Sequence, residues 1–372
     1  MDELKRKRLI RFFPAWIPRL NRLDVALVKR FLPNSRDHCI LKGMRLNVED
    51  RSFMVTARRR RRFGAVIGFV FLFPLAHSAE PETIEILSSK DKSMQKALFL
   101  IPKAAETAKR PLLVHLHSWS AHYNDSDSLK IAMEQAEKQG WIFISPEFRG
   151  PNDRPEAGAS PLAIADVLDA VKYAEKHAKV DRRYIYLLGG SGGGHMALMM
   201  AAVAPKLWTA VSAWVPITDL ADWHAFSKKA GSKYAEMMEA MCGGPPSAQA
   251  ECYKERSPLF RMEKAKGLRI QIEVGIEDGH KGAVPVRQSL WAFNALVKAN
   301  GWDSKLIPED AIAYITDKAK IPEDLAQDKP VVFMRKFPVL FYRQGGPVEL
   351  TIFDGGHATD FVSAVRWLDW HK

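Results

Sequence analysis

The sequence has few cysteines and lacks the short motifs that bind metals. It contains 3 cysteines among 372 residues, and neither a pair of CxxC motifs nor an HExxH motif occurs. Structural zinc sites and catalytic zinc helices depend on such clusters. The sequence therefore predicts no metal and no other cofactor. Internal repeats and low-complexity tracts are also lacking, which argues against a solenoid or fibrous architecture.

Excess charge is missing from most of the chain, although the formal net charge is +12. Residues 1–79 contain 18 Lys and Arg against 6 Asp and Glu, and the rest of the chain contains 37 of each sign. The larger part of the protein therefore has no overall electrostatic attraction to nucleic acid or to anionic lipid. We expect no nucleic-acid partner.

The positive charge belongs to a segment that has the three parts of a secretory signal. Arginines at 58–62 precede an apolar run at 63–76, and small residues at 76–79 offer a cleavage site. The apolar run is about 14 residues long, which is too short to span a bilayer. The sequence predicts a signal peptide at 54–79, export to the periplasm or beyond, and no stable membrane span in the mature protein.

Residues 1–53 precede this signal, and two explanations are open. Translation starts at Met54, so that the upstream residues are not translated, or residues 1–53 form a basic extension with an amphipathic stretch at 9–32. We favour the first explanation because Met54 stands where a signal peptide should begin. Cys39 then lies outside the mature chain, and we expect Cys242 and Cys252 to form a disulfide in an oxidising compartment.

From about residue 82, short apolar runs alternate with segments of helical periodicity. Runs rich in Leu, Ile and Val on both faces indicate an α/β fold with a mainly parallel, eight-stranded sheet flanked by helices. The expected strands are 83–87, 96–101, 112–117, 141–145, 184–188, 209–215, 269–274 and 348–353. The expected helices are 128–139, 161–177, 194–204, 286–300 and 358–370.

Two stretches interrupt this alternation. Residues 218–266 are rich in Trp, Met, Pro and Gly, and we interpret them as a cap or lid inserted after a strand. Residues 303–345 contain several charged turns and the breaks at Pro308 and Pro322, which indicates a second insertion. One hydrolase-like domain over 80–372 with two insertions explains this pattern better than two domains.

The strongest motif is a G-x-S-x-G sequence between a strand and a helix. The strand at 184–188 leads into Gly189-Gly190-Ser191-Gly192-Gly193, and an apolar helix follows. A sharp strand-to-helix turn presents a serine hydroxyl above a helix N-terminus, where the Gly192 amide can bind an oxyanion. A phosphate-binding loop of the Walker type would need a Lys before its Ser or Thr, and none is present. The order resembles the nucleophile elbow of α/β-hydrolases.

That resemblance directs attention to an acid and a base on later loops, in the order Ser, Asp, His. His357 follows the last strand and precedes the final helix, and Asp278 follows the strand at 269–274. Glu277 is an alternative acid, and His280 is a weaker alternative base because it shares the loop of Asp278. The remaining histidines that we weighed fit structural hydrogen bonding better: His115, His117, His195 and His371.

Tryptophans supply the candidates for the rest of the site. Trp119 follows the strand at 112–117, so that its amide is the candidate second oxyanion donor. Its indole, with Trp214 and Trp223, is a candidate wall of the substrate pocket. At helical spacing, such residues and the nearby Met237, Met238 and Met241 are more often core than pocket.

Residues 95–372 resemble the prolyl oligopeptidase-like (peptidase S9-type) branch of the α/β-hydrolases. The resemblance depends on the elbow, on Gly275 and Asp278 followed by Val284-Pro285, on Gly355-Gly356-His357, and on Phe148-Arg149-Gly150 followed by Asp166. It implies a Ser191, Asp278 and His357 triad with oxyanion donors at Gly192 and Trp119. Two features depart from the family pattern: residues 279–283 lengthen the acid loop, and no room for a β-propeller precedes the domain.

Three functions are consistent with these residues. The preferred one is an exported carboxylic-ester hydrolase that forms an acyl-enzyme and acts on a small or polysaccharide-linked ester. The alternative is an S9-type serine peptidase that uses the same triad. The third is a binding protein with a hydrolase fold, although such proteins usually lack a triad member, and all three members are present here.

Overall fold

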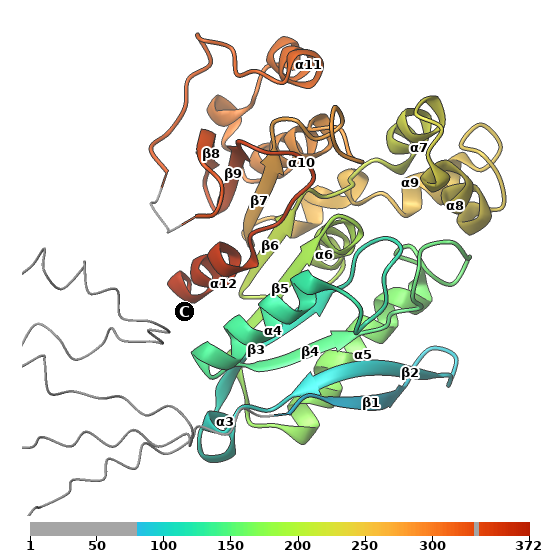
Figure 1. The fold of residues 1–372 in the computed structure, drawn as a ribbon, viewed down its shortest axis with the longest axis vertical. Coiled ribbons are helices and arrows are strands. Elements are labelled where there is room, and N and C mark those ends of the chain that lie inside the picture. The colour runs from blue at the N-terminus through green and yellow to red at the C-terminus, as the bar shows by residue number, and fades with distance from the viewer. Residues whose placement is uncertain (1–79, 331–334) are drawn as a thin grey trace, which may run out of the picture. The chain divides into compact units, whose positions relative to one another are not determined.

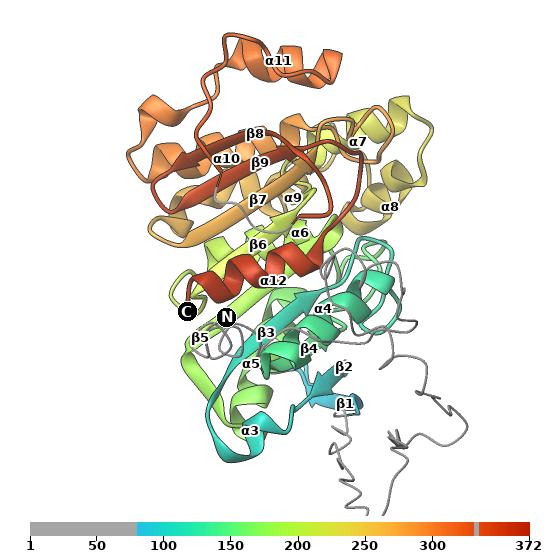
Figure 2. The ribbon, with the colours of Figure 1, turned by 60° about the vertical axis from the view of Figure 1, so that its left-hand side comes forward.

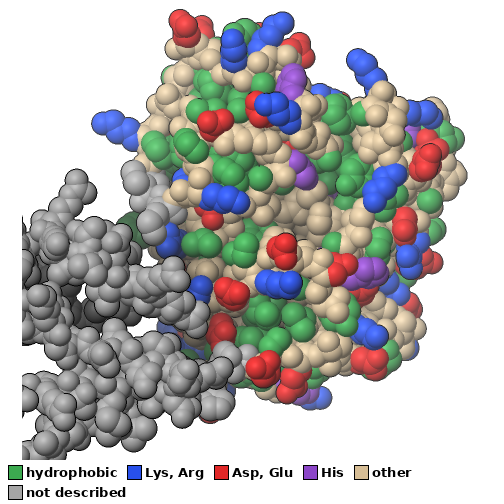
Figure 3. All heavy atoms as spheres, in the orientation of Figure 1, with side chains coloured by type: hydrophobic (Ala, Val, Ile, Leu, Met, Phe, Trp, Pro, Cys, Tyr) green, Lys and Arg blue, Asp and Glu red, His purple; other side chains and the backbone are tan. Residues whose placement is uncertain are grey.

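The computed structural model describes residues 80–330 and 335–372. The signal peptide predicted at 54–79 and the extension at 1–53 lie outside the described residues, so both stay predictions. Among the described helices, none combines the length and the apolar character that a membrane crossing requires. On the face drawn in Figure 3, basic and acidic side chains are interspersed, in keeping with the balanced charge of the sequence after residue 79.

A mixed, mostly parallel sheet of nine strands forms the centre of the domain (Figure 1). Its strand order is β1-β2-β4-β3-β5-β6-β7-β9-β8, and the five pairs from β4 to β9 are parallel. The two ends of the sheet are antiparallel. The strands are β1 Glu82–Leu87, β2 Met94–Leu100, β3 Arg110–Leu116, β4 Ile142–Pro146, β5 Val180–Gly190, β6 Ala210–Trp214, β7 Arg269–Gly275, β8 Val339–Gly345 and β9 Val348–Phe353.

Helices cover both faces of this sheet, which confirms the predicted fold class. Helices α4 and α12 lie side by side on one face (Figure 2), whereas α6, η2 and α10 pack together on the other. Strands β4, β6 and β9 are buried along their whole length, in keeping with their mainly apolar sequences. The helices are α3 Ala104–Thr107, α4 Asp127–Gln139, α5 Pro161–His177, α6 Gly192–Val203, α7 Leu220–Lys229, α8 Lys233–Cys242, α9 Ala250–Glu255, η2 Pro258–Ala265, α10 Arg287–Ala299, η3 Asp303–Lys305, α11 Glu309–Lys318 and α12 Phe361–Trp370.

The sequence-based prediction of eight strands was one short. Strand β8 lies within residues 303–345, which the sequence indicated as an insertion, and it pairs antiparallel with β9 at the edge of the sheet. Arg343 and Gln344 interrupt its apolar run, so the pattern was not read as a strand. The Arg343 side chain is nevertheless buried, because it donates to the carbonyl groups of Leu306 and Ala326. Two helix starts were also misplaced: α6 begins at Gly192 and α12 at Phe361.

Residues 218–266, which we call the cap, form the short helices α7, α8, α9 and η2. The first three lie together beyond the carboxyl ends of the parallel strands (Figure 1). They enclose a small apolar core of their own, whose cap members are Leu220, Trp223, Met238, Met241 and Tyr253. A disulfide joins Cys242 at the end of α8 to Cys252 in α9, with 5.7 Å between the two Cα atoms.

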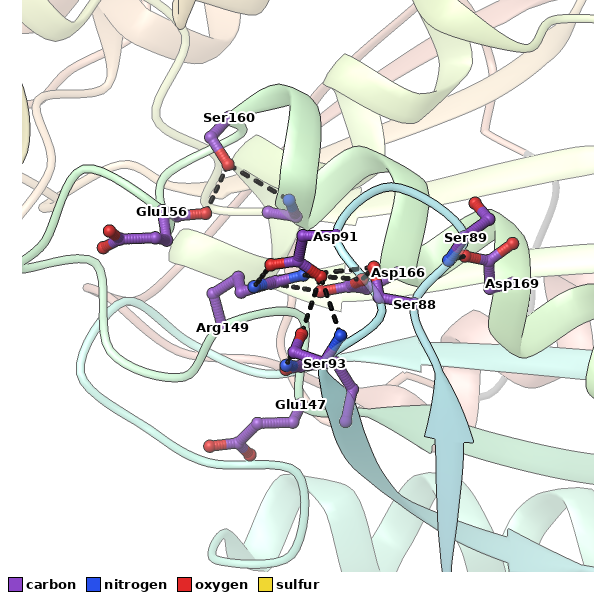
Figure 4. Close-up of polar contacts among 12 residues, drawn as sticks. Ser88, Ser89, Asp91, Ser93, Glu147, Arg149, Glu156, Ser160, Asp166 and Asp169 are labelled. Atoms are coloured by element: carbon purple, nitrogen blue, oxygen red, sulfur yellow. Dashed lines mark hydrogen bonds and ion pairs between the residues drawn. The ribbon is translucent and has the colours of Figure 1, made fainter.

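Arg149, in the loop after β4, ties three segments together (Figure 4). Its Nε lies 2.5 Å from Oδ2 of Asp166 in α5, and its Nη1 lies 2.8 Å from Oδ2 of Asp91 in the β1–β2 turn. Ser88 donates a further hydrogen bond to Asp166. The Arg149 side chain is 8% exposed and that of Asp166 is 1% exposed. The hydrogen bond from Arg149 lowers the pKa of Asp91, so the Asp91 carboxyl is ionised at neutral pH.

Replacing Arg149 should therefore destabilise the fold strongly. Arg149→Met leaves the buried Asp166 carboxylate without its cation, and removing one partner of a buried pair costs about 3–5 kcal/mol. Urea denaturation measures the change in the free energy of unfolding. The control is Arg154→Met, because Arg154 pairs with Asp153 at the surface and such pairs contribute about 1 kcal/mol or less. Equal effects of the two substitutions would contradict the prediction.

Candidate active site

The predicted site residues lie on loops that follow neighbouring parallel strands. Strands β3, β5, β7 and β9 end at Leu116, Gly190, Gly275 and Phe353, and the loops after them contain Trp119, Ser191, Asp278 and His357 in that order. Because the carboxyl ends of parallel strands share one edge of a sheet, residues far apart in sequence meet there. Strand β6 ends at the same edge and leads into the cap.

Ser191 occupies a strained turn between β5 and α6. Its backbone angles are φ 58° and ψ −119°, a region that residues with a side chain rarely adopt. The Ser191 amide donates to the Trp214 carbonyl of β6 at 2.9 Å, which anchors the turn to the next strand. A Cβ on Gly189 would lie 2.2 Å from the Gly193 carbonyl oxygen, so the turn closes only with glycine at position 189.

Ser191, His357 and Asp278 form a continuous chain of hydrogen bonds. Ser191 Oγ lies 2.9 Å from His357 Nε2, and His357 Nδ1 lies 2.7 Å from Asp278 Oδ2. With the Asp278 carboxylate ionised, the imidazole donates from Nδ1 and accepts the serine proton at Nε2. The Asp278 side chain is fully buried, whereas that of His357 is partly exposed. The arrangement therefore holds a base beside the hydroxyl and keeps the base in the required tautomer.

The Asp278 carboxylate is fixed by its own loop. Its Oδ1 accepts hydrogen bonds from the Gly279 and Val284 amides, each at 3.1 Å. Residues 279–283, which we call the acid loop, begin at the first of these donors and end just before the second. Gly282 packs directly against the triad, since a Cβ there would lie 2.3 Å from Asp278 Oδ1. The acid loop therefore keeps both the Gly279 and the Val284 amide bonded to the carboxylate.

The two candidate oxyanion donors come together at the same turn. A Cβ on Gly192 would lie 2.3 Å from the Trp119 amide nitrogen, so the two backbones are in direct contact. Within the described residues, the structure gives the Trp119 amide no hydrogen-bond acceptor. This amide and that of Gly192, at the N-terminus of α6, are therefore available for a developing negative charge near Ser191.

A cavity of about 260 Å³ opens at Ser191, and we call it the serine cavity. Its lining includes Ser118, Ser128, Tyr234, His357 and Thr359. The sequence did not single out Tyr234, Ser128 or Thr359, because no local motif marks a residue that reaches a site through the packing of the cap or of a neighbouring loop. Ser118 had one signal, its position next to Trp119.

The prediction that Trp119, Trp214 and Trp223 line the pocket needs correction. All three side chains are about 99% buried and none borders the serine cavity. Trp214 lies in the main core and donates from its indole to Ser212 at 3.0 Å. Trp119 and Trp223 pack edge to face in the cap core, with ring centroids 4.7 Å apart. Packing against other aromatic rings therefore removes these indoles from the cavity surface.

The alternative catalytic residues make other contacts. Glu277 forms an ion pair with Lys281 at 2.6 Å, and His280 Nε2 donates to the Thr316 carbonyl at 2.7 Å. The other histidines weighed for a base role also bond elsewhere, His115 to Ser145, His117 to the Glu147 carbonyl, His195 to the Arg256 carbonyl and His371 near Glu349. Within residues 80–330 and 335–372, no three His, Cys, Asp or Glu side chains are grouped to hold a metal ion.

Comparison with known proteins agrees with this geometry. Residues 159–309 match the model of the prolyl oligopeptidase family, Peptidase_S9, a range that contains Ser191 and Asp278. Over these residues the chain is similar to the peptidase S9 family. Acylamino-acid-releasing enzyme 1 of Oryza sativa subsp. japonica is 24% identical to this chain over 227 residues, which cover 55% of this chain and 28% of that protein.

Solved structures share the fold of the described domain. An acylaminoacyl peptidase of Pyrococcus horikoshii superposes with a TM-score of 0.50 and 19% identity, covering 67% of this chain and 39% of that one. A puromycin-hydrolyzing peptidase of Mycobacterium tuberculosis gives a TM-score of 0.50 and 18% identity, covering 60% and 34% of the two chains. The chain therefore spans well under half the length of each of these relatives.

The contact between Gly192 and Trp119 generates a prediction for the oxyanion site. Gly192→Ala should push the Trp119 amide away from Ser191, because the new Cβ would overlap that amide. Loss of one oxyanion donor lowers kcat by about 10²–10³-fold. The matched control is Gly356→Ala, next to His357, where a Cβ meets nothing nearer than 3.8 Å. Similar kcat values for the two variants would contradict the oxyanion assignment.

His195, near the start of α6, generates a prediction for acid stability. Its ring packs against Trp119, and burial lowers the pKa of His195 to about 4. The folded state then binds fewer protons than the unfolded state between pH 6.5 and 4, so this contribution is present above pH 6.5 and is lost as the pH falls toward 4. Against a His195→Gln variant, the wild-type free energy of unfolding should fall more steeply over this interval, by up to about 1.4 kcal/mol per pH unit. Urea denaturation at several pH values measures both slopes, and parallel slopes would refute the prediction.

Proposed function

We propose that this protein is a serine peptidase that cleaves short N-acylated peptides through an acyl-enzyme. The observation that carries the proposal is the hydrogen-bonded chain from Ser191 through His357 to Asp278, which opens onto the serine cavity in an S9 domain. Neutral serine is a weak nucleophile, and an oriented imidazole supplies the base that it needs.

The steps follow from the positions of the atoms. Ser191 Oγ attacks the carbonyl carbon while its proton passes to His357 Nε2, and the Gly192 and Trp119 amides bind the resulting oxyanion. The C–N bond then breaks, and His357 returns the proton to the departing amine. Water repeats the sequence at the ester carbon, which releases the acyl product and restores Ser191.

The choice of peptides over esters is supported by the relatives. The sequence by itself favoured a carboxylic-ester hydrolase. The matching family is a peptidase family, and the relatives reported above are named as acylamino-acid-releasing, acylaminoacyl and puromycin-hydrolyzing enzymes. An ester is an easier substrate for the same steps, so activated esters should also be cleaved.

The serine cavity favours an acylated over a free amine. Its lining consists of hydroxyl-bearing and small residues together with His357, and no Asp or Glu of the described residues is among them. A substrate with a free α-amine would bring a positive charge into a cavity without a carboxylate to pair with it, and burying an unpaired charge is costly. An N-acyl group removes that charge.

This proposal predicts a clear order of substrates. N-acetyl-alanine p-nitroanilide should have a kcat/KM at least about 10-fold above that of alanine p-nitroanilide, a difference equal to about 1.4 kcal/mol in transition-state binding. Initial rates of p-nitroaniline release measure both values. Ser191→Ala is the control that assigns the activity to this site.

Two outcomes would change the proposal. Cleavage of p-nitrophenyl acetate without cleavage of either anilide would favour the ester hydrolase, and a preference for the free amine would reject the acylated substrate class.

We also propose that the domain works outside the cytoplasm, on the basis of the arginine-rich and apolar segment at 58–76. The cap disulfide suits an oxidising compartment. Sequencing the N-terminus of the mature protein tests this part.

A further inference from the structure

A second cavity, larger than the serine cavity, lies between the cap and the acid loop. Its volume is about 460 Å³, and we call it the acid-loop cavity. Phe226 and Ser227 of α7 and Ser232 form the cap side, and residues 279–283 form the other side. The acid loop thus forms one wall of this cavity. Its volume falls within the range of small-molecule sites.

Ser227 marks the cavity as a site that is ready to bind a polar group. Its side chain is 99% buried, and its Oγ has no hydrogen-bond partner in the described part of the chain. A buried hydroxyl without a partner costs roughly 1–3 kcal/mol, so such groups are rare in folded proteins. Ser227 lines the cavity, but its Oγ is covered, so a ligand there supplies the missing hydrogen bond only after the side chain rotates toward the cavity.

The charges around the cavity favour an anion. Lys281 lines it, and no Asp or Glu is among its lining residues in the described structure. The Lys281 ammonium group lies 2.6 Å from Glu277 Oε1, so its charge is partly compensated but remains at the cavity. His280, also in the lining, donates from Nε2 to the Thr316 carbonyl. Phe226 adds an aromatic surface for an apolar side chain.

The acid-loop cavity adjoins the triad. A Cβ on Gly282 would lie 2.7 Å from the His357 Cβ, so a single residue separates the cavity from the catalytic imidazole. On the cap side, Ser232 lines the acid-loop cavity and Tyr234, two residues later, lines the serine cavity. His357 and the start of α8 at residues 232–234 therefore lie between the two cavities. A substrate that extends past His357 can reach both.

We propose that the acid-loop cavity binds the carboxylate end of the leaving group, with Lys281 and Ser227 as its partners. This inference rests on the proposed peptidase function, since a short peptide leaves as an amine that ends in a carboxylate. The acyl part lies in the serine cavity, and the departing amino acid or dipeptide extends past His357 into the acid-loop cavity.

The test uses the dipeptide Ala-Ala as an inhibitor of p-nitrophenyl acetate hydrolysis by the full chain. Its C-terminal amide, Ala-Ala-NH₂, is the uncharged comparison. Ala-Ala should inhibit competitively, with an inhibition constant about fivefold lower than that of the amide, as expected for a charge pair near the surface. Equal inhibition by the two compounds, non-competitive inhibition, or no inhibition would overturn the inference.

Two variants should change the difference between the inhibition constants of Ala-Ala and its amide in opposite directions. A general loosening of the acid loop would not produce opposite changes. Lys281→Met should abolish the difference between acid and amide, and Glu277→Gln should enlarge it, because it frees the Lys281 charge. Ser227→Ala should weaken inhibition by Ala-Ala. The control is Lys229→Met on the exposed side of α7, which should leave both constants unchanged.

The readout separates this inference from the proposed function. Ester hydrolysis reports on the acid-loop cavity even if no peptide bond is cleaved, so a carboxylate effect without peptide cleavage would reject the peptidase and keep the cavity assignment. Cleavage of N-acetyl-Ala-Ala-Ala and of its C-terminal amide at equal kcat/KM would keep the peptidase and reject the cavity assignment.

Discussion

The contact between two backbones, at Gly192 and Trp119, is the constraint on which the site depends. Strands β3 and β5 are parallel neighbours, so the loops after them meet at one edge of the sheet. A side chain at Gly192 would overlap Trp119, and one at Gly193 would lie 2.1 Å from the Leu116 carbonyl oxygen. Glycine at both positions lets the turn at Ser191 lie against the β3 loop. The same contact places two amides beside the serine, so the oxyanion site is built from main chain and not from side chains.

The cap is joined to both halves of this site through Trp223. Its ring packs against Trp119 on the oxyanion side, and its indole donates to the Ala283 carbonyl of the acid loop at 2.8 Å. The cap disulfide holds α8 to α9, and α8 carries Tyr234 into the serine cavity. A shift of α7 would therefore act on the oxyanion loop, on the acid loop and on the cavity wall together. The cap is part of the site's framework and not merely a cover.

The fold class and the positions of the triad candidates could be predicted because each has a local signal. The glycines around Ser191 mark the turn, and Asp278 and His357 follow strands in which apolar residues recur at every second position. The burial of the tryptophans could not be predicted, since an indole packs as well against a ligand as against a neighbouring ring, and only the tertiary contacts decide. Strand β8 was missed for a related reason: Arg343 reads as a break until Leu306 and Ala326, distant in sequence, accept its hydrogen bonds. A feature that is set by residues within one segment can be predicted from the sequence. A feature that depends on contacts with distant residues cannot.

The acid loop shows how a site can vary without disturbing its chemistry. The Asp278 carboxylate is held by the amides of Gly279 and Val284, which lie at the two ends of the loop, and by His357. The residues between the two amides add no further hydrogen bond to the carboxylate, but a Cβ on Gly282 would lie 2.3 Å from Asp278 Oδ1. The acid loop also forms one side of a 460 Å³ cavity next to the base. Gly279 takes part in both, because its amide supports the acid and the residue lines the cavity. Variation that leaves the acid in place is therefore confined to the loop residues other than Gly279 and Gly282.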